Sequence, residues 1–346
     1  MFAAIFHEFG TADVVRYEEV PMPVPGPGEL LVEVRAAAFN HLDVWVRRGL
    51  PIETTMPHIG GSDVAGVVVG RGEMEAFSEG ARVVVNPALW CGRCRECARG
   101  EESMCELFRI LGEHTNGGFA QYVAVPAANA YEIPPEITFE AAACLPISYQ
   151  TAWRALVSRA RLRPGEDVLV VGASGGTAIA AIQIAKLAGA RVFALTSGPE
   201  NVARVRALGA DVVYDRLEVE FSRALAADTA KRGVDVVVEN VGAPTWEGSI
   251  RSLAPGGRLV TYGATGGPKV EIDIRRLFWK QFEIIGTTMA SRGEFEAMLR
   301  AAWAGKLTPV IDSVLPLARA AEGHRRIEEG DQFGKIVLQP SRHPDA

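Results

Sequence analysis

The sequence has no apolar run near the roughly 18 residues that a membrane-spanning helix needs. It also lacks the basic start and long apolar stretch of a secretion signal. Its 36 lysines and arginines are outnumbered by 42 aspartates and glutamates, giving a formal net charge of −6. This balance argues against nucleic acid and anionic membranes as partners. Without repeats or low-complexity segments either, the chain is expected to be a cytoplasmic globular protein.

A length of 346 residues exceeds what one ordinary core supports, so two domains are expected. The first part of the chain, to about residue 126, is punctuated by glycine and proline between short strand-like runs. This pattern is typical of an all-β unit with barrel or sandwich character. The runs are residues 30–35, 64–69, 81–85 and 119–125.

From about residue 151 to 287 the pattern changes to strands alternating with helices, such as 201–208 and 245–253. Six candidate strands predict a doubly wound α/β sheet of dinucleotide-binding type. They are residues 168–171, 192–195, 212–214, 234–238, 258–262 and 282–285. The tail contains a helix, an extended piece, another helix and a final strand-like run, and we expect it to return to the first domain.

A glycine-rich turn lies at the start of this second region. Four consecutive β-formers, Val168–Val171, precede Gly-Ala-Ser-Gly-Gly-Thr-Ala, and a helix rich in alanine and isoleucine follows. Such a strand–turn–helix directs backbone N–H groups and a helix N-terminus at a pyrophosphate. Ala173, Gly175 and Ala178 occupy the three fingerprint positions. The alternative is an ordinary tight turn without a ligand.

The residues that follow the second strand of this region indicate which of NAD and NADP is bound. NAD-selective folds usually carry an acidic residue there, which binds the ribose 2′-hydroxyl. Here the strand ends in Thr196-Ser197-Gly198, and Arg204 on the next helix could approach a 2′-phosphate. NADP(H) is therefore favoured over NAD(H).

Four cysteines lie within fifteen residues, in the spacing C-x2-C-x2-C-x7-C. Four thiolates close a tetrahedral zinc site with no open position, so we predict one structural zinc ion per chain. Disulfides are disfavoured in a reducing compartment, and an iron–sulfur cluster is the other alternative. The predicted ligands are Cys91, Cys94, Cys97 and Cys105.

The dinucleotide turn together with the four-cysteine lobe resembles the medium-chain dehydrogenase/reductase superfamily, which contains zinc alcohol dehydrogenases and quinone reductases. Glu239–Gly242, Gly263–Thr265 and the ending Gly334-Lys-Ile-Val stand in the same order as in that family. The resemblance implies a GroES-like catalytic domain over 1–150, with the zinc lobe at about 88–110. It further implies a Rossmann domain over 151–288, and a tail, 289–346, that returns to the catalytic domain.

By this resemblance, the residues that bind the cofactor come from the turn, the strand ends that follow it, and one helix before it. They are Thr151, Ser174, Gly175, Gly176, Thr177, Thr196, Ser197, Arg204, Asn240, Gly263, Ala264, Thr265 and Thr288.

At the positions where the family carries its catalytic-zinc ligands, this chain departs from the family's pattern. Where alcohol dehydrogenases carry Cys, His and Cys, this chain has Asn40, Ser62 and Ile147. An amide, a hydroxyl and an alkyl group do not hold zinc. The alternative is a rebuilt second metal site, for which the neighbouring candidates are His41, His58, Asp43 and Asp63.

Without that metal the reductive direction is chemically easier, because hydrogen-bond donors alone can stabilise the enolate-type oxygen formed on a quinone or enone. Asn40 and Ser62 are the candidate donors, although Asn40 could instead be a turn residue bonded to its own backbone. Asp43 could orient His41 or Arg47, or form a structural ion pair.

The sequence therefore predicts an NADPH-dependent reductase of quinones or activated enones. The alternative is an NAD-dependent alcohol dehydrogenase acting on a primary or secondary alcohol, and a third possibility is a cofactor-binding protein that is not an enzyme. The last strand of the dinucleotide domain, 282–288, would leave a sheet edge exposed. Pairing of such edges predicts a homodimer or homotetramer.

Overall fold

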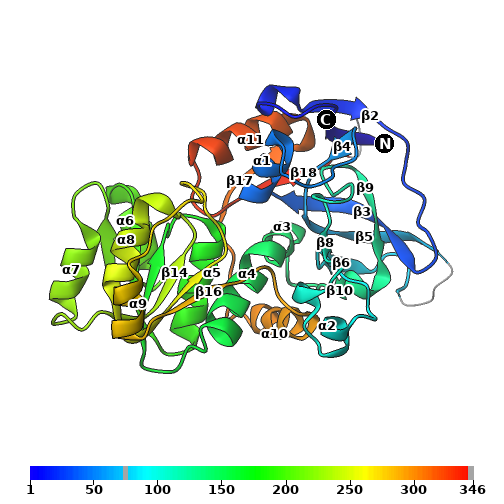
Figure 1. Ribbon diagram of the computed structural model, residues 1–346. Helices are drawn as coiled ribbons and strands as arrows, with labels where there is room; N and C mark the ends of the chain where they lie inside the picture. Colours follow the sequence, from blue (N-terminus) through cyan, green and yellow to red (C-terminus); the bar gives the residue numbers. More distant parts are fainter. Residues whose placement is uncertain (73–76, 342–346) are drawn as a thin grey trace. The chain divides into compact units, whose positions relative to one another are not determined.

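The protein was analysed as a computed structural model that describes residues 1–72 and 77–341 (Figure 1). The chain forms two compact units. Unit 1 comprises Met1–Ile147, Ser291–Trp303 and the chain from Thr308 onward, while unit 2 comprises Ser148–Ala290 with Ala304–Leu307. Both ends of the chain therefore belong to one unit, and the middle of the chain forms the other.

Unit 1 is built on a seven-stranded mixed sheet in the order β10-β6-β5-β3-β18-β17, with β9 also paired to β3. The longest strand, β3, alternates buried and half-buried residues along its first half, as expected of a strand with one face on the core. The strands are β3 (Glu29–Ala38), β5 (Asp63–Arg71), β6 (Arg82–Val85), β9 (Tyr122–Pro126), β10 (Ala130–Glu132), β17 (Ile311–Pro316) and β18 (Lys335–Gln339).

Two small sheets and several helices complete unit 1. One sheet joins β1 (Phe2–Phe6), β2 (Arg16–Glu19) and β4 (His58–Ile59), and the other joins β7 (Ala88–Leu89) to β8 (Arg109–Ile110). The helices are α1 (His41–Arg48), α2 (Arg95–Ala98), α3 (Phe139–Ala143), α10 (Arg292–Trp303) and α11 (Ala320–Glu329).

The expected strand over 119–125 begins only at Tyr122. The backbone of Phe119 is already committed elsewhere, because its N–H donates to the Gly60 oxygen and its oxygen accepts from Ala4. Alternating hydrophobicity does not reveal that switch of partners. In the tail, β18 lies between β3 and β17 in the sheet of unit 1.

Unit 2 contains a parallel six-stranded sheet in the order β13-β12-β11-β14-β15-β16, which confirms the predicted doubly wound arrangement. Its central strand is fully buried over Val168–Val171, as expected for a parallel strand covered on both faces. The strands are β11 (Asp167–Val171), β12 (Arg191–Thr196), β13 (Val212–Asp215), β14 (Val234–Glu239), β15 (Leu253–Thr261) and β16 (Glu283–Gly286).

Helices connect these strands and pack against the sheet (Figure 1). They are α4 (Pro146–Trp153), which continues as a π-helical segment over Arg154–Arg159, α5 (Gly176–Leu187), α6 (Pro199–Ala207), α7 (Phe221–Asp228), α8 (Ala243–Ser252) and α9 (Ile274–Lys280). Among the described residues, no helix combines the length and apolar character that crossing a bilayer requires.

Candidate active site and metal centre

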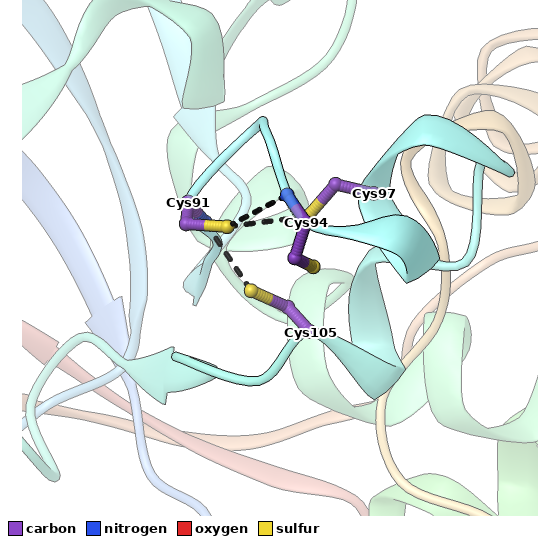
Figure 2. A group of neighbouring side chains, drawn as sticks. All are labelled: Cys91, Cys94, Cys97 and Cys105. Atoms are coloured by element: carbon purple, nitrogen blue, oxygen red, sulfur yellow. Dashed lines mark hydrogen bonds between the residues drawn. The ribbon is translucent and has the colours of Figure 1, made fainter.

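The four cysteines converge in unit 1, with α2 and the turn before Cys105 supplying the backbone around them (Figure 2). Their sulfur atoms all lie within 4.8 Å of one another, and the Sγ atoms of Cys91 and Cys97 are 3.9 Å apart. Four thiolates around one zinc ion have sulfurs about 3.8 Å apart, given a Zn–S bond near 2.3 Å. The lobe is thus already close to the geometry of a closed zinc site.

Backbone N–H groups donate to these sulfurs and favour the thiolate form that a metal requires. Cys94 donates to the Sγ of Cys91, while Cys91 and Leu107 donate to the Sγ of Cys105, each at 3.3 Å. A backbone hydrogen bond from Cys97 is the largest of the causes that lower the pKa of Cys94 to about 6. Burial and neighbouring thiols raise the pKa of Cys97 to about 12, which a cation among the sulfurs would reverse.

The glycine-rich turn of unit 2 has the geometry that an anion site needs. Gly172 has φ +70°, and a Cβ there would lie 2.8 Å from the Asn240 Oδ1. Helix α5 begins at Gly176, and its N-cap, Gly175, provides no side-chain cap. The first N–H groups of this twelve-residue helix are therefore free of a side-chain acceptor and fit a pyrophosphate.

The carboxyl ends of the parallel strands bring most of the predicted cofactor residues to one edge of this sheet. Ser174 and Thr177 flank the turn after β11, Thr196 and Ser197 end β12, Asn240 follows β14, and Thr288 follows β16. Gly263–Thr265 follow β15, and the Thr265 N–H donates to the Asn240 oxygen at 3.1 Å. Thr151 instead lies buried within α4.

A second arginine lies at the end of β12. The Nε of Arg216, which directly follows β13, donates to the Oγ of Ser197 at 2.6 Å. Arg204, the arginine named from the sequence, lies 3.9 Å from Glu200 one helical turn earlier. The sequence argument missed Arg216 because β12 and β13 become neighbours only in the folded sheet.

Two of the three positions that the family resemblance gives for zinc ligands, Asn40 and Ile147, contact one carboxylate in unit 1, that of Asp63. Asn40 donates from Nδ2 to the Asp63 Oδ2 at 2.9 Å, and the Ile147 N–H donates to Oδ1 at 2.8 Å. The Nζ of Lys335 donates to the same Oδ2 at 2.9 Å and to the Asn40 Oδ1 at 2.6 Å. The side chains of Asp63 and Lys335 are only 0% and 4% exposed, so this closed triangle is fully buried.

Asp43, in the first turn of α1, holds the backbone around this triangle. Its Oδ2 accepts from the Asn40 N–H at 2.7 Å and its Oδ1 from the Gly61 N–H at 3.0 Å. Burial raises the pKa of Asp43 to about 7, against the lowering effect of these two N–H groups. Of the alternatives that the sequence left open for Asp43, Arg47 pairs instead with Glu328 on α11.

Ser62 directly precedes Asp63, and its side chain is fully buried. Within residues 1–72 and 77–341, its hydroxyl has no hydrogen-bond partner. A buried hydroxyl without a partner is costly, so this group is a candidate for contact with a bound molecule.

Two partners in this cluster were missed by sequence reasoning. Asp63 was considered only as a metal ligand, and Lys335 was noted only as part of the family's ending. The signal for Lys335 was present, because a lysine directly before the apolar run Ile336–Leu338 needs a buried counter-ion. Its partners, however, are almost 300 residues away in the sequence.

The side chains proposed for a rebuilt metal site have other bonds. His58 contacts the Gly112 oxygen through Nε2 at 3.0 Å, and Asp43 and Asp63 accept N–H donors as described. In the described part of the chain, the cysteines form the only group of three or more His, Cys, Asp or Glu side chains with ligand atoms close enough for one ion.

Comparison with known proteins identifies both halves of the chain. Residues 26–135 match the alcohol dehydrogenase GroES-like domain, and residues 176–304 match the zinc-binding dehydrogenase family. The chain is 43% identical to a solved NAD-dependent alcohol dehydrogenase, with a TM-score of 0.95 over 98% of this chain and 99% of that one.

Three curated relatives carry three different activities in their names. The NAD-dependent alcohol dehydrogenase of Sulfolobus acidocaldarius is 33% identical over 98% of this chain and 99% of its own length. The human quinone oxidoreductase is 30% identical over 98% and 97%. The acryloyl-coenzyme A reductase of Metallosphaera sedula is 31% identical over 92% and 95%.

Proposed function

Because the chain belongs to the zinc-binding dehydrogenases of the medium-chain dehydrogenase/reductase superfamily and is an NAD(P)-dependent oxidoreductase, we propose that it is an NADPH-dependent reductase. Its substrates would be quinones or activated C=C bonds. The single observation that supports this choice is the buried triangle of Asn40, Asp63 and Lys335.

The triangle does not fit a catalytic zinc ion. Asn40 and Ile147 direct N–H donors at Asp63, and a metal needs lone pairs from its ligands. The remaining amide oxygen of Asn40 accepts from the Lys335 ammonium. The proposed reaction therefore uses no metal ion at these positions, and the zinc ion proposed for the protein is the structural one.

The triangle also changes the roles proposed from the sequence. The amide of Asn40 is occupied, which makes Asn40 a positioning residue for Asp63 and Lys335. The Ser62 hydroxyl has a donor to offer, and the Lys335 ammonium uses two of its three within the triangle. A buried hydroxyl that has no partner in the protein is suited to donating to the negative oxygen that forms when a conjugated carbonyl is reduced.

The cofactor, when bound, supplies the hydride. Its pyrophosphate would be held by the N-terminus of α5, and the Ser197–Arg216 pair supports NADPH because a guanidinium and a hydroxyl together suit a 2′-phosphate. Arg216→Ala should weaken NADPH binding at least tenfold in calorimetry and leave NADH nearly unchanged. Arg204→Ala is the matched control, and an equal loss for both cofactors would refute the assignment.

The activity is tested by NADPH oxidation with a panel that includes 1,4-naphthoquinone and acryloyl-coenzyme A. We expect turnover with at least one acceptor that persists after treatment with a metal chelator. Absence of turnover with every acceptor, in zinc-replete protein, would defeat the proposal.

Alcohol oxidation is the second candidate, supported by the names of the relatives and by the four-cysteine lobe they accompany. It requires a Lewis acid to lower the pKa of an unactivated alcohol, and therefore predicts two zinc ions per chain. A metal count of one with no alcohol-dependent formation of NADH or NADPH would remove this candidate.

We also propose that the protein is a homo-oligomer that pairs through unit 2. Strand β16 is the last strand of its sheet, and the neighbouring α9 exposes Ile274, Phe278 and Trp279 at 66%, 63% and 79%. Exposed aromatic patches beside a free sheet edge are typical of interfaces. Trp279→Glu should lower the sedimentation mass, and an unchanged mass would contradict this surface.

A further inference from the structure

Unit 1 contains a buried carboxyl group that the proposed reduction does not use. Glu113 is 8% exposed and lies in the loop that follows β8. Within the described residues no hydrogen-bond donor reaches its carboxyl group. The nearest basic atom, the His114 Nδ1, is 3.6 Å from its Oε2 and already accepts the Ile110 N–H at 3.1 Å.

The loop that carries Glu113 is fixed against the segment that leads to Ser62. The N–H groups of Gly117 and Gly118 donate to the Ile59 and Gly61 oxygens, each at 2.7 Å. The Ile59 N–H in turn donates to the Asn116 Oδ1 at 3.0 Å. These bonds allow the loop little freedom relative to β4 and Ser62.

Glycine residues allow the backbones of the loop and of the segment before Ser62 to approach each other closely. A Cβ on Gly112 would lie 2.7 Å from the Gly61 carbonyl carbon, and one on Gly117 would lie 2.3 Å from the Gly61 oxygen. Glu113 follows the first of these glycines and Ser62 follows Gly61. The carboxyl group and the catalytic candidate thus extend from backbone segments in direct contact.

The two segments share a further property, which is polar side chains without protein partners. In the described part of the chain the hydroxyls of Ser62 and Thr115 are buried without a hydrogen-bond partner, and the buried Glu113 lies two residues from Thr115 in the same loop. Folded proteins rarely leave such groups unsatisfied, and a cluster of them indicates a place where a bound molecule supplies the partners.

Burial without a donor decides the protonation state of Glu113. An ionised carboxylate would have no hydrogen-bond donor there, so burial favours the neutral acid up to about pH 7. Accordingly, burial raises the pKa of Glu113 to about 7. The groups that face this loop are His114 on the loop, Arg109 on β8, His58 on β4 and Asp43 below Gly61, and burial outweighs them all.

We propose that Glu113, as a neutral carboxylic acid, is the catalytic proton donor that completes the reduction. This inference rests on the proposed function. The acceptor takes a hydride from the cofactor at one carbon, and its π electrons move to the carbonyl oxygen. The O–H bond of Glu113 then breaks, and the proton goes to the enolate carbon or, in a quinone, to the enolate oxygen, after which the keto–enol product tautomerises to the hydroquinone. Water returns a proton to the carboxylate, so that one hydride and one proton are consumed per product.

The test compares Glu113→Gln, which keeps size but holds no acidic proton, with Glu113→Asp, which keeps the acid. With 1,4-naphthoquinone or acryloyl-coenzyme A, Glu113→Gln should lower kcat about 10²- to 10⁴-fold, and Glu113→Asp should restore part of it. Wild-type kcat should fall tenfold per pH unit above about pH 7, and the profile of Glu113→Gln should be flat. Glu136→Gln, an exposed glutamate of the same unit, is the matched control.

Infrared titration gives a reading that does not depend on turnover. Two carbonyl bands of protonated carboxylic acids are expected at pH 6, those of Asp43 and Glu113, and both should disappear near pH 7. Glu113→Gln should lack one of them and Asp43→Asn the other. Wild-type kcat and an unchanged pH profile in Glu113→Gln would overturn the role of Glu113 and leave the reductase intact. A wild type that reduces no acceptor would overturn the reductase and the proton's destination together, while the infrared band would still report whether Glu113 holds a proton.

Discussion

The cysteine lobe and the Asp63 triangle both lie in unit 1, and both gather charge within a small volume, but they neutralise it in opposite ways. The lobe collects four thiols, whose thiolate charge a zinc ion would balance. The triangle balances the Asp63 carboxylate with Lys335 from the same chain. One site is suited to an ion from solution, and the other contains its own counter-ion.

The two sites also differ in how far apart their residues lie in the sequence. The cysteines span fifteen residues, and α2 and the turns around it form their scaffold. The triangle joins α1, β5 and β18, which meet only when the seven-stranded sheet is complete. The comparison therefore predicts that damage to the lobe is reported by metal content, and damage to the triangle by the stability of the whole unit.

The largest expected effect is loss of the zinc ion. Cys105→Ser should reduce the zinc content from one ion per chain to none in mass spectrometry of the metal. Binding at such sites is worth about 10–16 kcal/mol in model peptides, which sets the upper bound for the lost stabilisation. Cys144→Ala is the control, since Cys144 is buried but not a ligand, and it should keep the zinc. Retention of zinc by Cys105→Ser would contradict the assignment of Cys105 as a zinc ligand.

Removal of the internal cation should have the next largest effect. Lys335→Met leaves the Asp63 carboxylate buried without its counter-ion, and such losses cost about 3–5 kcal/mol in denaturant unfolding. Combining Lys335→Met with Asp63→Asn should recover much of the lost unfolding free energy, because the second substitution removes the uncompensated charge. A Lys335→Met protein as stable as wild type would show that the triangle is not a charge pair in solution.

The pH dependence of unfolding tests Asp43. Its pKa is raised from 3.8 to about 7 in the folded protein, so the folded state binds a proton that the unfolded state has released. Its stabilising contribution is therefore present below about pH 4 and is lost as the pH rises to 7, by about 4 kcal/mol in total. Asp43→Asn should remove this slope from unfolding curves, and Glu113 leaves a smaller slope of the same sign. An identical slope in both proteins would refute the shift.

The smallest effect is expected for an exposed ion pair, a kind of contact that neither of the two sites contains. Arg161 and Glu283 of unit 2 lie 2.6 Å apart with side chains 55% and 48% exposed. Water and salt weaken such pairs to below about 1 kcal/mol. Glu283→Gln should therefore change the unfolding free energy far less than Lys335→Met, and an equal cost would show that burial is not what separates the two pairs.

Much of this architecture could be predicted from local patterns. The six strands of unit 2 were each recognisable by a run of β-formers, and the order of the sheet follows from their alternation with helices. The cysteine spacing encodes its own geometry, because the ligands are neighbours in the sequence. The absence of zinc ligands at Asn40, Ser62 and Ile147 was equally visible.

The contacts that give the site its charge could not be predicted in the same way. Lys335 meets Asn40 across 295 positions of sequence, and Arg216 meets Ser197 across a pair of parallel strands. The partners of Asp43 stay open in the sequence, because a helix start offers a carboxylate several donors and the close approach of Gly61 appears only in the fold. Short helices such as α9 carry too few residues for a periodic signal.

The placement of β18 has a consequence for how the protein is made. Lys335 is separated by 272 residues of sequence from Asp63, the carboxylate that it neutralises. Synthesis runs from the N-terminus, so the strand that begins at Asp63 is made long before β18. Until β18 joins the sheet, the Asp63 carboxylate has no buried counter-ion, and the seven-stranded sheet of unit 1 closes late.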